Sequence, residues 1–120
     1  MDILTVAQMA AHAAADKQAT RVILQDVRGH SDLCQFQLIC SGSNEKQTQA
    51  ICQGIEENLR KAGIRPMAIE GKTTGQWILV DYGSLIVHVF CSQVRDHYSL
   101  EALFPGAKTV EIAPSMAPSA

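Results

Sequence analysis

Several features that define common protein classes are absent from this sequence of 120 residues. No apolar run approaches the roughly 20 residues that a membrane-spanning helix needs, and the N-terminus lacks the charged and apolar segments of a signal peptide. The formal net charge is −2, and no run of lysine or arginine forms a basic stripe. We therefore expect a soluble cytoplasmic protein without a dedicated nucleic-acid-binding patch and without a membrane partner.

The four cysteines and four histidines do not have the spacings of metal sites. No two cysteines form C-x-x-C and no two histidines form H-x-x-x-H, so a structural zinc site has no support from the sequence. The hydrophobic content of 47% allows a chain of this length to fold on its core without a disulfide framework. We expect reduced thiols, no metal and no cofactor.

The clearest local pattern is a hairpin over residues 77–90. Two apolar runs rich in β-branched residues, 77–82 and 85–90, are separated by Gly83-Ser84, a typical two-residue turn. This turn pairs Trp77 with Phe90 and Val80 with Val87. Alternation then gives one apolar face, and a second face that mixes aromatic, acidic and imidazole groups as recognition surfaces do: Trp77, Leu79, Asp81, Ile86, His88 and Phe90. On this face Asp81 lies diagonally across from His88 and is expected to neutralise it.

The remaining sequence predicts a single α/β domain. Thr5 and Gln8 have the spacing of a capping box for a first helix that runs to about residue 17, and a second helix follows Gly42-Ser43-Asn44 and ends at Gly63. Apolar runs predict three further strands, at residues 21–27, 36–40 and 67–70, and a short helix capped by Ser92 follows the hairpin. We predict a mixed five-stranded sheet with the two main helices on one face, a domain over residues 1–106, and a flexible C-terminal tail over residues 107–120.

The chain resembles the ribosomal silencing factor family, whose members are also called Iojap-like proteins. The resemblance rests on Lys17, on LQDV at 24–27, on LICSG at 38–42, and on Glu70-Gly71. It rests above all on G-x-W-I-L-V-D-Y-G, I-V-H-V-F, R-x-x-Y and S-L-E-x-L-F between residues 75 and 104. Gln35, Gln47, Ser84 and Phe104 depart from the family pattern, although Phe104 keeps an aromatic side chain where tryptophan is usual.

This resemblance implies a nucleotidyltransferase-like fold without a catalytic role, and a protein that forms a homodimer when free. It also implies binding to the large ribosomal subunit through ribosomal protein L-fourteen, which blocks the small subunit from joining and represses translation. An interface with a basic ribosomal protein would combine acids with an apolar centre. The residues expected to contact the partner are Glu70, Trp77, Asp81, His88, Arg95, Tyr98, Glu101 and Phe104.

Other functions remain open on the residues alone. Gly42-Ser43 before a helix suits a nucleotidyltransferase or an anion site, but helix capping explains the same residues, and the nearest acids, Glu45, Glu56 and Glu57, would diverge on a helix. A cysteine hydrolase built from Cys91, His88 and Asp81 conflicts with strand geometry, because Cys91 and His88 are three residues apart and point to opposite faces. Trp77 fits a core residue and an interface residue about equally well.

Overall fold

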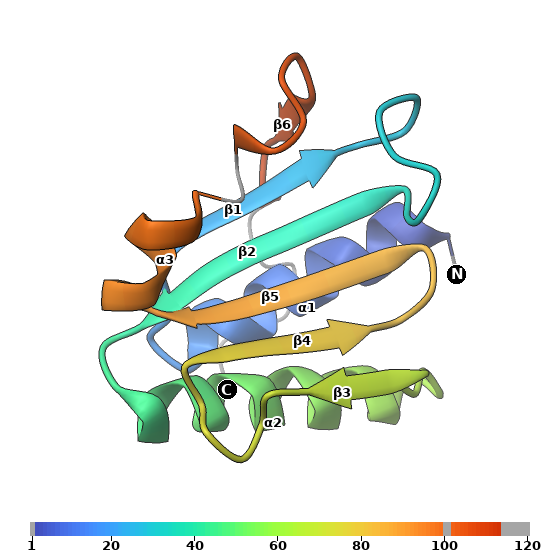
Figure 1. Cartoon of the computed structure of the whole chain (residues 1–120). Coiled ribbons are helices and arrows are strands. Elements are labelled where there is room, and N and C mark those ends of the chain that lie inside the picture. Colours follow the sequence, from blue (N-terminus) through green and yellow to red (C-terminus); the bar gives the residue numbers. More distant parts are fainter. Residues whose placement is uncertain (1, 100–101, 114–120) are drawn as a thin grey trace.

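The computed structural model describes residues 2–99 and 102–113, which form one sheet with helices packed on it (Figure 1). The helices are α1 (Ile3–Asp16), α2 (Glu45–Lys61) and α3 (Ser92–Tyr98). The strands are β1 (Thr20–Asp26), β2 (Phe36–Gly42), β3 (Ala68–Glu70), β4 (Trp77–Asp81), β5 (Leu85–Cys91) and β6 (Lys108–Val110).

The sheet has six strands in the order β3-β4-β5-β2-β1-β6. Strands β2 and β5 are parallel and every other neighbouring pair is antiparallel, so the sheet is mixed as predicted. The predicted number of five strands is wrong because β6 falls within residues 107–120, which composition had marked as a flexible tail. Three residues of β6 extend the sheet edge by pairing with β1.

The segment after β6 is also attached to the domain. The Gln8 side chain on α1 donates to the Glu111 carbonyl at 2.9 Å and accepts from the Ala113 N–H at 2.8 Å. One glutamine therefore holds this stretch by its backbone, and only two apolar side chains of the described C-terminal residues, Val110 and Ile112, pack against the core. This explains why a composition poor in apolar residues concealed a docked segment.

Helices α1 and α2 cover the same face of the sheet, as predicted, and Figure 1 shows both behind the strands. We call this the helix face and the opposite one the open face. Asp2 caps α1 by accepting from the Thr5 N–H at 2.8 Å, so the predicted Thr5–Gln8 capping box is wrong. Alanines in α1 and the stripe Ile51, Ile55 and Leu59 in α2 are buried against the strands.

Among the described residues, no helix is long and apolar enough to cross a membrane. The four cysteines are free and buried, and burial raises the pKa of the Cys40 and Cys52 thiols to about 12. These thiols are therefore protonated at neutral pH, as expected of small packing residues in a core.

Candidate functional site

The hairpin of β4 and β5 has the predicted register. Trp77 pairs with Phe90 and Val80 with Val87, and the Tyr82 N–H donates to the Leu85 carbonyl across the Gly83-Ser84 turn at 2.8 Å. The apolar set lies in the core on the helix face, with Ile78, Val80, Leu85, Val87 and Val89 fully buried. The mixed set therefore lies on the open face, as the sequence predicted.

The loop that precedes β4 fixes the position of Trp77. Gly71 has φ +81°, and a Cβ there would lie 2.1 Å from the Trp77 carbonyl oxygen, so only glycine fits. The Thr48 hydroxyl on α2 donates to the Gly75 carbonyl, and the Gln49 side chain donates to the Lys72 carbonyl at 2.9 Å. The loop is thus anchored to α2, and β4 begins in a defined place.

Four rings form an aromatic cluster at one end of the open face: Trp77, His88, Phe90 and Tyr98. The Trp77 ring is stacked on Phe90 with 5.0 Å between centroids, and its centroid lies 4.8 Å from that of Tyr98. Phe90 is fully buried, Trp77 is half-buried and Tyr98 is 50% exposed. Trp77 is therefore a packing residue that also forms part of the surface.

His88 is held in the aromatic cluster by the indole of Trp77. The Trp77 Nε1–H donates to His88 Nδ1 at 3.1 Å. Burial lowers the pKa of His88 to about 4, so the ring is neutral at pH 7. Because Nδ1 accepts, the single ring proton lies on Nε2.

The expected pairing of Asp81 with His88 is wrong. The Asp81 carboxylate instead accepts from the Gly83 N–H at 2.7 Å and so stabilises the hairpin turn. The neutral imidazole of His88 carries no charge for a carboxylate to balance, whereas the partly buried Gly83 N–H gains a charge-assisted hydrogen bond.

Arg95 on α3 is completely buried, which removes it from direct contact with a partner. Its Nη1 donates to the Ser41 hydroxyl at 2.8 Å and to the Arg21 carbonyl. Arg21 has φ +49°, and the register of β1 on β2 shifts between Thr20 and Ile23. This bulge turns the backbone toward α3, so the guanidinium fastens the helix that carries Tyr98 to β1 and β2.

The remaining residues predicted to contact a partner are Glu70, Phe104 and Glu101. Glu70 is exposed at the end of β3 beside Trp77 and Leu79, where the surface has a hollow of about 220 Å³. Phe104 is half-buried and lies beside Leu103 over the strands. Glu101 lies outside the described residues.

Sequence reasoning missed the part of the open face between β5 and β1. There the Gln37 side chain donates to Gln25 at 3.0 Å in a buried pair, and the exposed Leu33 and Leu103 stand on two loops. The only available signals were Leu33 in a polar loop and Leu103 next to the predicted contact residue Phe104. They did not show that the loops meet over the same strands.

The geometry gives little support to the alternative functions. Asn44 caps α2, and the Ser43 N–H and hydroxyl both donate to the Gln47 side chain at 2.7 Å, so the groups expected at an anion site are engaged. His88 and Cys91 both belong to β5 at positions that face opposite ways, as expected. Within residues 2–99 and 102–113, no three His, Cys, Asp or Glu side chains cluster as a metal site.

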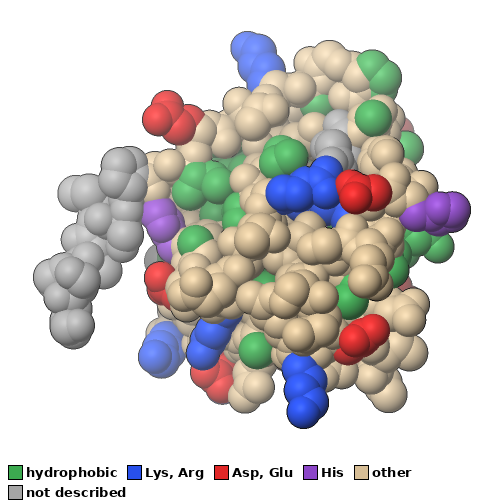
Figure 2. Space-filling view, turned by 90° about the vertical axis from the view of Figure 1, so that its left-hand side faces the viewer, with side chains coloured by type: hydrophobic (Ala, Val, Ile, Leu, Met, Phe, Trp, Pro, Cys, Tyr) green, Lys and Arg blue, Asp and Glu red, His purple; other side chains and the backbone are tan. Residues whose placement is uncertain are grey.

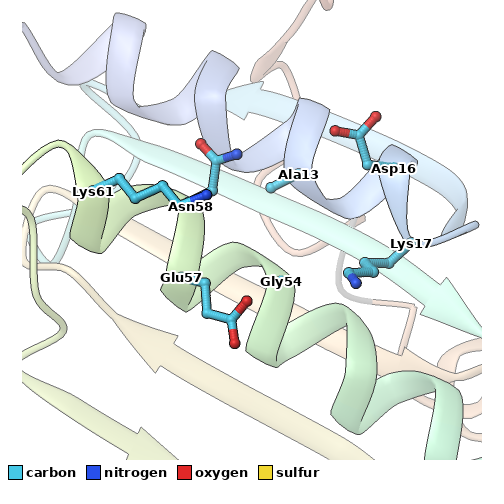
Figure 3. Close-up of a pocket in the computed structure, with 7 residues that line it drawn as sticks. All are labelled: Ala13, Asp16, Lys17, Gly54, Glu57, Asn58 and Lys61. Atoms are coloured by element: carbon cyan, nitrogen blue, oxygen red, sulfur yellow. The ribbon is translucent and has the colours of Figure 1, made fainter. Parts of the chain in front are cut away.

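A groove of about 140 Å³ lies on the helix face between α1 and α2. The Lys17 stem packs over Gly54, where a Cβ would come within 2.8 Å of it. Figure 3 shows Asp16 at the end of α1, Lys17 just after it, and Glu57 and Lys61 from α2, with charged ends that do not converge on one point. This groove has the features of a helix–helix contact with a solvated rim.

Charges are dispersed on the side of the molecule that Figure 2 shows. Figure 2, which views the molecule from the side on the left of Figure 1, shows Lys and Arg next to Asp and Glu among apolar and neutral groups. The Arg21–Asp96 ion pair, at 2.7 Å, is exposed on both sides. Such pairs do not create a field that selects a polyanion.

The fold and the site define a small α/β protein with an aromatic cluster on the open face of a mixed six-stranded sheet. The chain belongs to the ribosomal silencing factor family, because the family model described as "Ribosomal silencing factor during starvation" matches residues 1–120. The resemblance seen in the sequence is thereby confirmed.

Individual relatives agree with this assignment. The chain is 39% identical over 105 residues to the ribosomal silencing factor of Halalkalibacterium halodurans, which covers 88% of this chain and 90% of the relative. A crystal structure of a Chromobacterium violaceum protein matches with a TM-score of 0.85 at 30% identity, over 98% of each chain. A mouse protein named "Mitochondrial assembly of ribosomal large subunit protein 1" is 42% identical over 70 residues, which is 56% of this chain and 31% of that protein.

Proposed function

We propose that this protein represses translation by binding the large ribosomal subunit through ribosomal protein L-fourteen and so blocking the small subunit. The family supports a role at the ribosome, and the name of the mouse relative refers to the large subunit. The observation that carries the proposal is the aromatic cluster, in which Trp77 and the half-exposed Tyr98 are fixed by packing on the open face. Rigid aromatic side chains of this kind are common interface anchors.

Acidic side chains near the aromatic cluster suit a basic partner. Glu70 lies beside Trp77, and Asp96 is on α3, two residues before Tyr98. We infer direct contacts from Glu70, Trp77, Asp81, Tyr98 and Phe104, and also from Glu101. Arg95 acts through Tyr98 by holding α3. Steric exclusion requires affinity and no bond chemistry, so the proposed function is not enzymatic.

Three further properties belong to the same proposal. They are a homodimer when the protein is free, a cytoplasmic location, and a fold related to nucleotidyltransferases without their activity. Light scattering of the purified protein tests the first of these. A molar mass of one chain, 13.0 kDa, at micromolar concentration contradicts it.

The decisive experiment separates binding from its consequence. Purified large and small subunits are sedimented separately with the protein, and subunit joining is then followed by light scattering at increasing protein concentration. The proposal requires co-sedimentation with the large subunit alone and loss of joining over the same concentration range. Binding to the small subunit, or joining that continues with saturated large subunits, contradicts it.

A further inference from the structure

Beside the aromatic cluster, the open face contains an apolar pocket of about 180 Å³. Strands β2, β4 and β5 form its floor, and two loops that are distant in sequence form its walls. The residues that line this apolar pocket are Ser31, Leu33, Cys34, Gln37, Leu79, Ile86, His88, Leu103 and Phe104. It shares Leu79 with the hollow beside Trp77, so the two features form one continuous surface.

The walls of the apolar pocket expose large hydrophobic side chains. Leu33 is 83% exposed and Leu103 is 57% exposed, although the loops that carry them meet over the same strands. Two leucines that flank one hollow in this way are typical of a surface that a partner covers.

The floor of the apolar pocket holds a hydrogen-bond donor without a partner. His88 is only 6% exposed, and its Nδ1 is engaged by Trp77. The proton on Nε2 has no acceptor among the described residues. Because the ring lines an open pocket, this donor can be satisfied by water in the free protein and by an acceptor from a bound partner.

The charge around the apolar pocket is acidic. Asp32 is exposed next to Leu33, and Asp81 is near enough to Cys34 to contribute to the raised pKa of that thiol, after the larger effect of burial. None of the residues that line the pocket is a lysine or arginine. This arrangement disfavours phosphate groups, and it also disfavours a second copy of this chain, whose net charge is −2.

We propose that the apolar pocket receives one large apolar side chain of a basic protein, and that a carbonyl group of the same segment accepts the His88 Nε2 proton. Lysine or arginine residues next to that side chain would meet Asp32 and Asp81. The inference rests on the proposed function, because it takes the partner to be a protein of the large ribosomal subunit. It adds a second anchor point to the aromatic cluster.

Photo-cross-linking identifies the occupant directly. The photoreactive residue p-benzoylphenylalanine is placed at Leu33, and, as a matched control, at Leu4, an exposed leucine of α1. Irradiation with purified large subunits should link position 33, but not position 4, to a peptide with an apolar residue beside lysine or arginine. Links to ribosomal RNA or to a second copy overturn the inference, as does the absence of any link while the protein still co-sediments.

Matched substitutions test the two components of the apolar pocket. Leu33→Ala and Leu103→Ala should each weaken binding to large subunits by about tenfold, whereas Leu4→Ala should not change it. His88→Gln places an amide N–H near the position of Nε2. His88→Asn places an amide oxygen near the position of Nδ1, where it can only accept from Trp77. The His88→Asn protein should therefore bind large subunits more weakly than the His88→Gln protein. Circular dichroism confirms folding of each variant.

The outcomes separate the two proposals. Equal binding by the wild type, Leu33→Ala and Leu103→Ala overturns the pocket inference and leaves the proposed function intact. Stronger binding by His88→Asn than by His88→Gln overturns the role of Nε2. A wild-type protein that does not sediment with large subunits contradicts the proposed function itself, and with it the partner named for the apolar pocket.

Discussion

The two faces of the sheet are built from the same strands and differ in what they bury. On the helix face, alternate residues of β2, β4 and β5 are apolar, most of them aliphatic, and are buried beneath α1 and α2. On the open face, the intervening residues include aromatic, amide and imidazole groups, and exposed leucines remain beside them. Stability therefore resides mainly on the helix face, which leaves the open face able to retain groups suited to recognition.

The largest expected difference in unfolding free energy is between alanine substitutions at two neighbouring residues of β5. Leu85 is fully buried on the helix face and Ile86 is half-buried on the open face. Leu85→Ala should lower the free energy of unfolding by about 3 kcal/mol because it leaves a cavity, and Ile86→Ala by about 1 kcal/mol. Urea denaturation followed by circular dichroism measures both, and equal losses would remove the distinction between the faces.

Arg95 connects the two regions, and its loss should affect stability and the aromatic cluster together. Arg95→Met leaves the Ser41 hydroxyl and the Arg21 carbonyl without this donor, which should cost about 2 kcal/mol. Since α3 then loosens, Tyr98 should move from Trp77 and change the tryptophan emission spectrum. Arg95→Lys keeps a charged donor, so it should lose less stability and change the emission spectrum less than Arg95→Met. An unchanged spectrum in a folded Arg95→Met protein would show that Tyr98 is positioned without Arg95.

His88 should make stability depend on pH. Its pKa is lowered from about 6.5 to about 4 in the folded protein, so between these values the unfolded chain binds more protons. Stability is therefore lost as the pH falls below 6.5, by about 2 kcal/mol between pH 7 and pH 5. Urea denaturation at the two pH values measures this loss. His88→Gln should reduce it, and an equal loss in that variant would assign the effect to other groups.

The smallest loss of stability is expected on removal of the exposed ion pair between Arg21 and Asp96. Both side chains are largely solvated, and such pairs contribute about 0.5 kcal/mol or less. Asp96→Ala should therefore leave the melting temperature and the Trp77 emission almost unchanged. A loss comparable to that of Arg95→Met would mean that the surface pair, and not the buried guanidinium, holds α3.

The parts of the fold that sequence predicted are those set by local rules. The Gly83-Ser84 turn fixes the register of β4 on β5, and the stripe Ile51, Ile55 and Leu59 fixes the buried side of α2. Strand β6 was missed because three residues that pair with β1 carry no pattern of their own. The start of α1 was misplaced because the Asp2 carboxylate accepts from the Thr5 N–H, which the predicted capping box assigned to the Gln8 side chain.

The candidate site was predictable in its residues and not in their roles. Trp77 and Tyr98 are on the surface as expected, whereas His88 is buried beside Trp77 of the same hairpin and Arg95 is buried by contacts with segments distant in the chain. Whether a polar side chain is exposed depends on what packs over it. For Arg95 that depended on a bulge in β1, which no local pattern indicates.

The central claim is that the open face, and not the helix face, binds the ribosome. It is tested most directly by the affinity of purified large subunits for Tyr98→Ala and for Leu4→Ala, measured by co-sedimentation at constant salt. The account predicts binding at least about tenfold weaker for Tyr98→Ala and unchanged for Leu4→Ala, with both proteins folded. Wild-type affinity in Tyr98→Ala together with a loss in Leu4→Ala would contradict it.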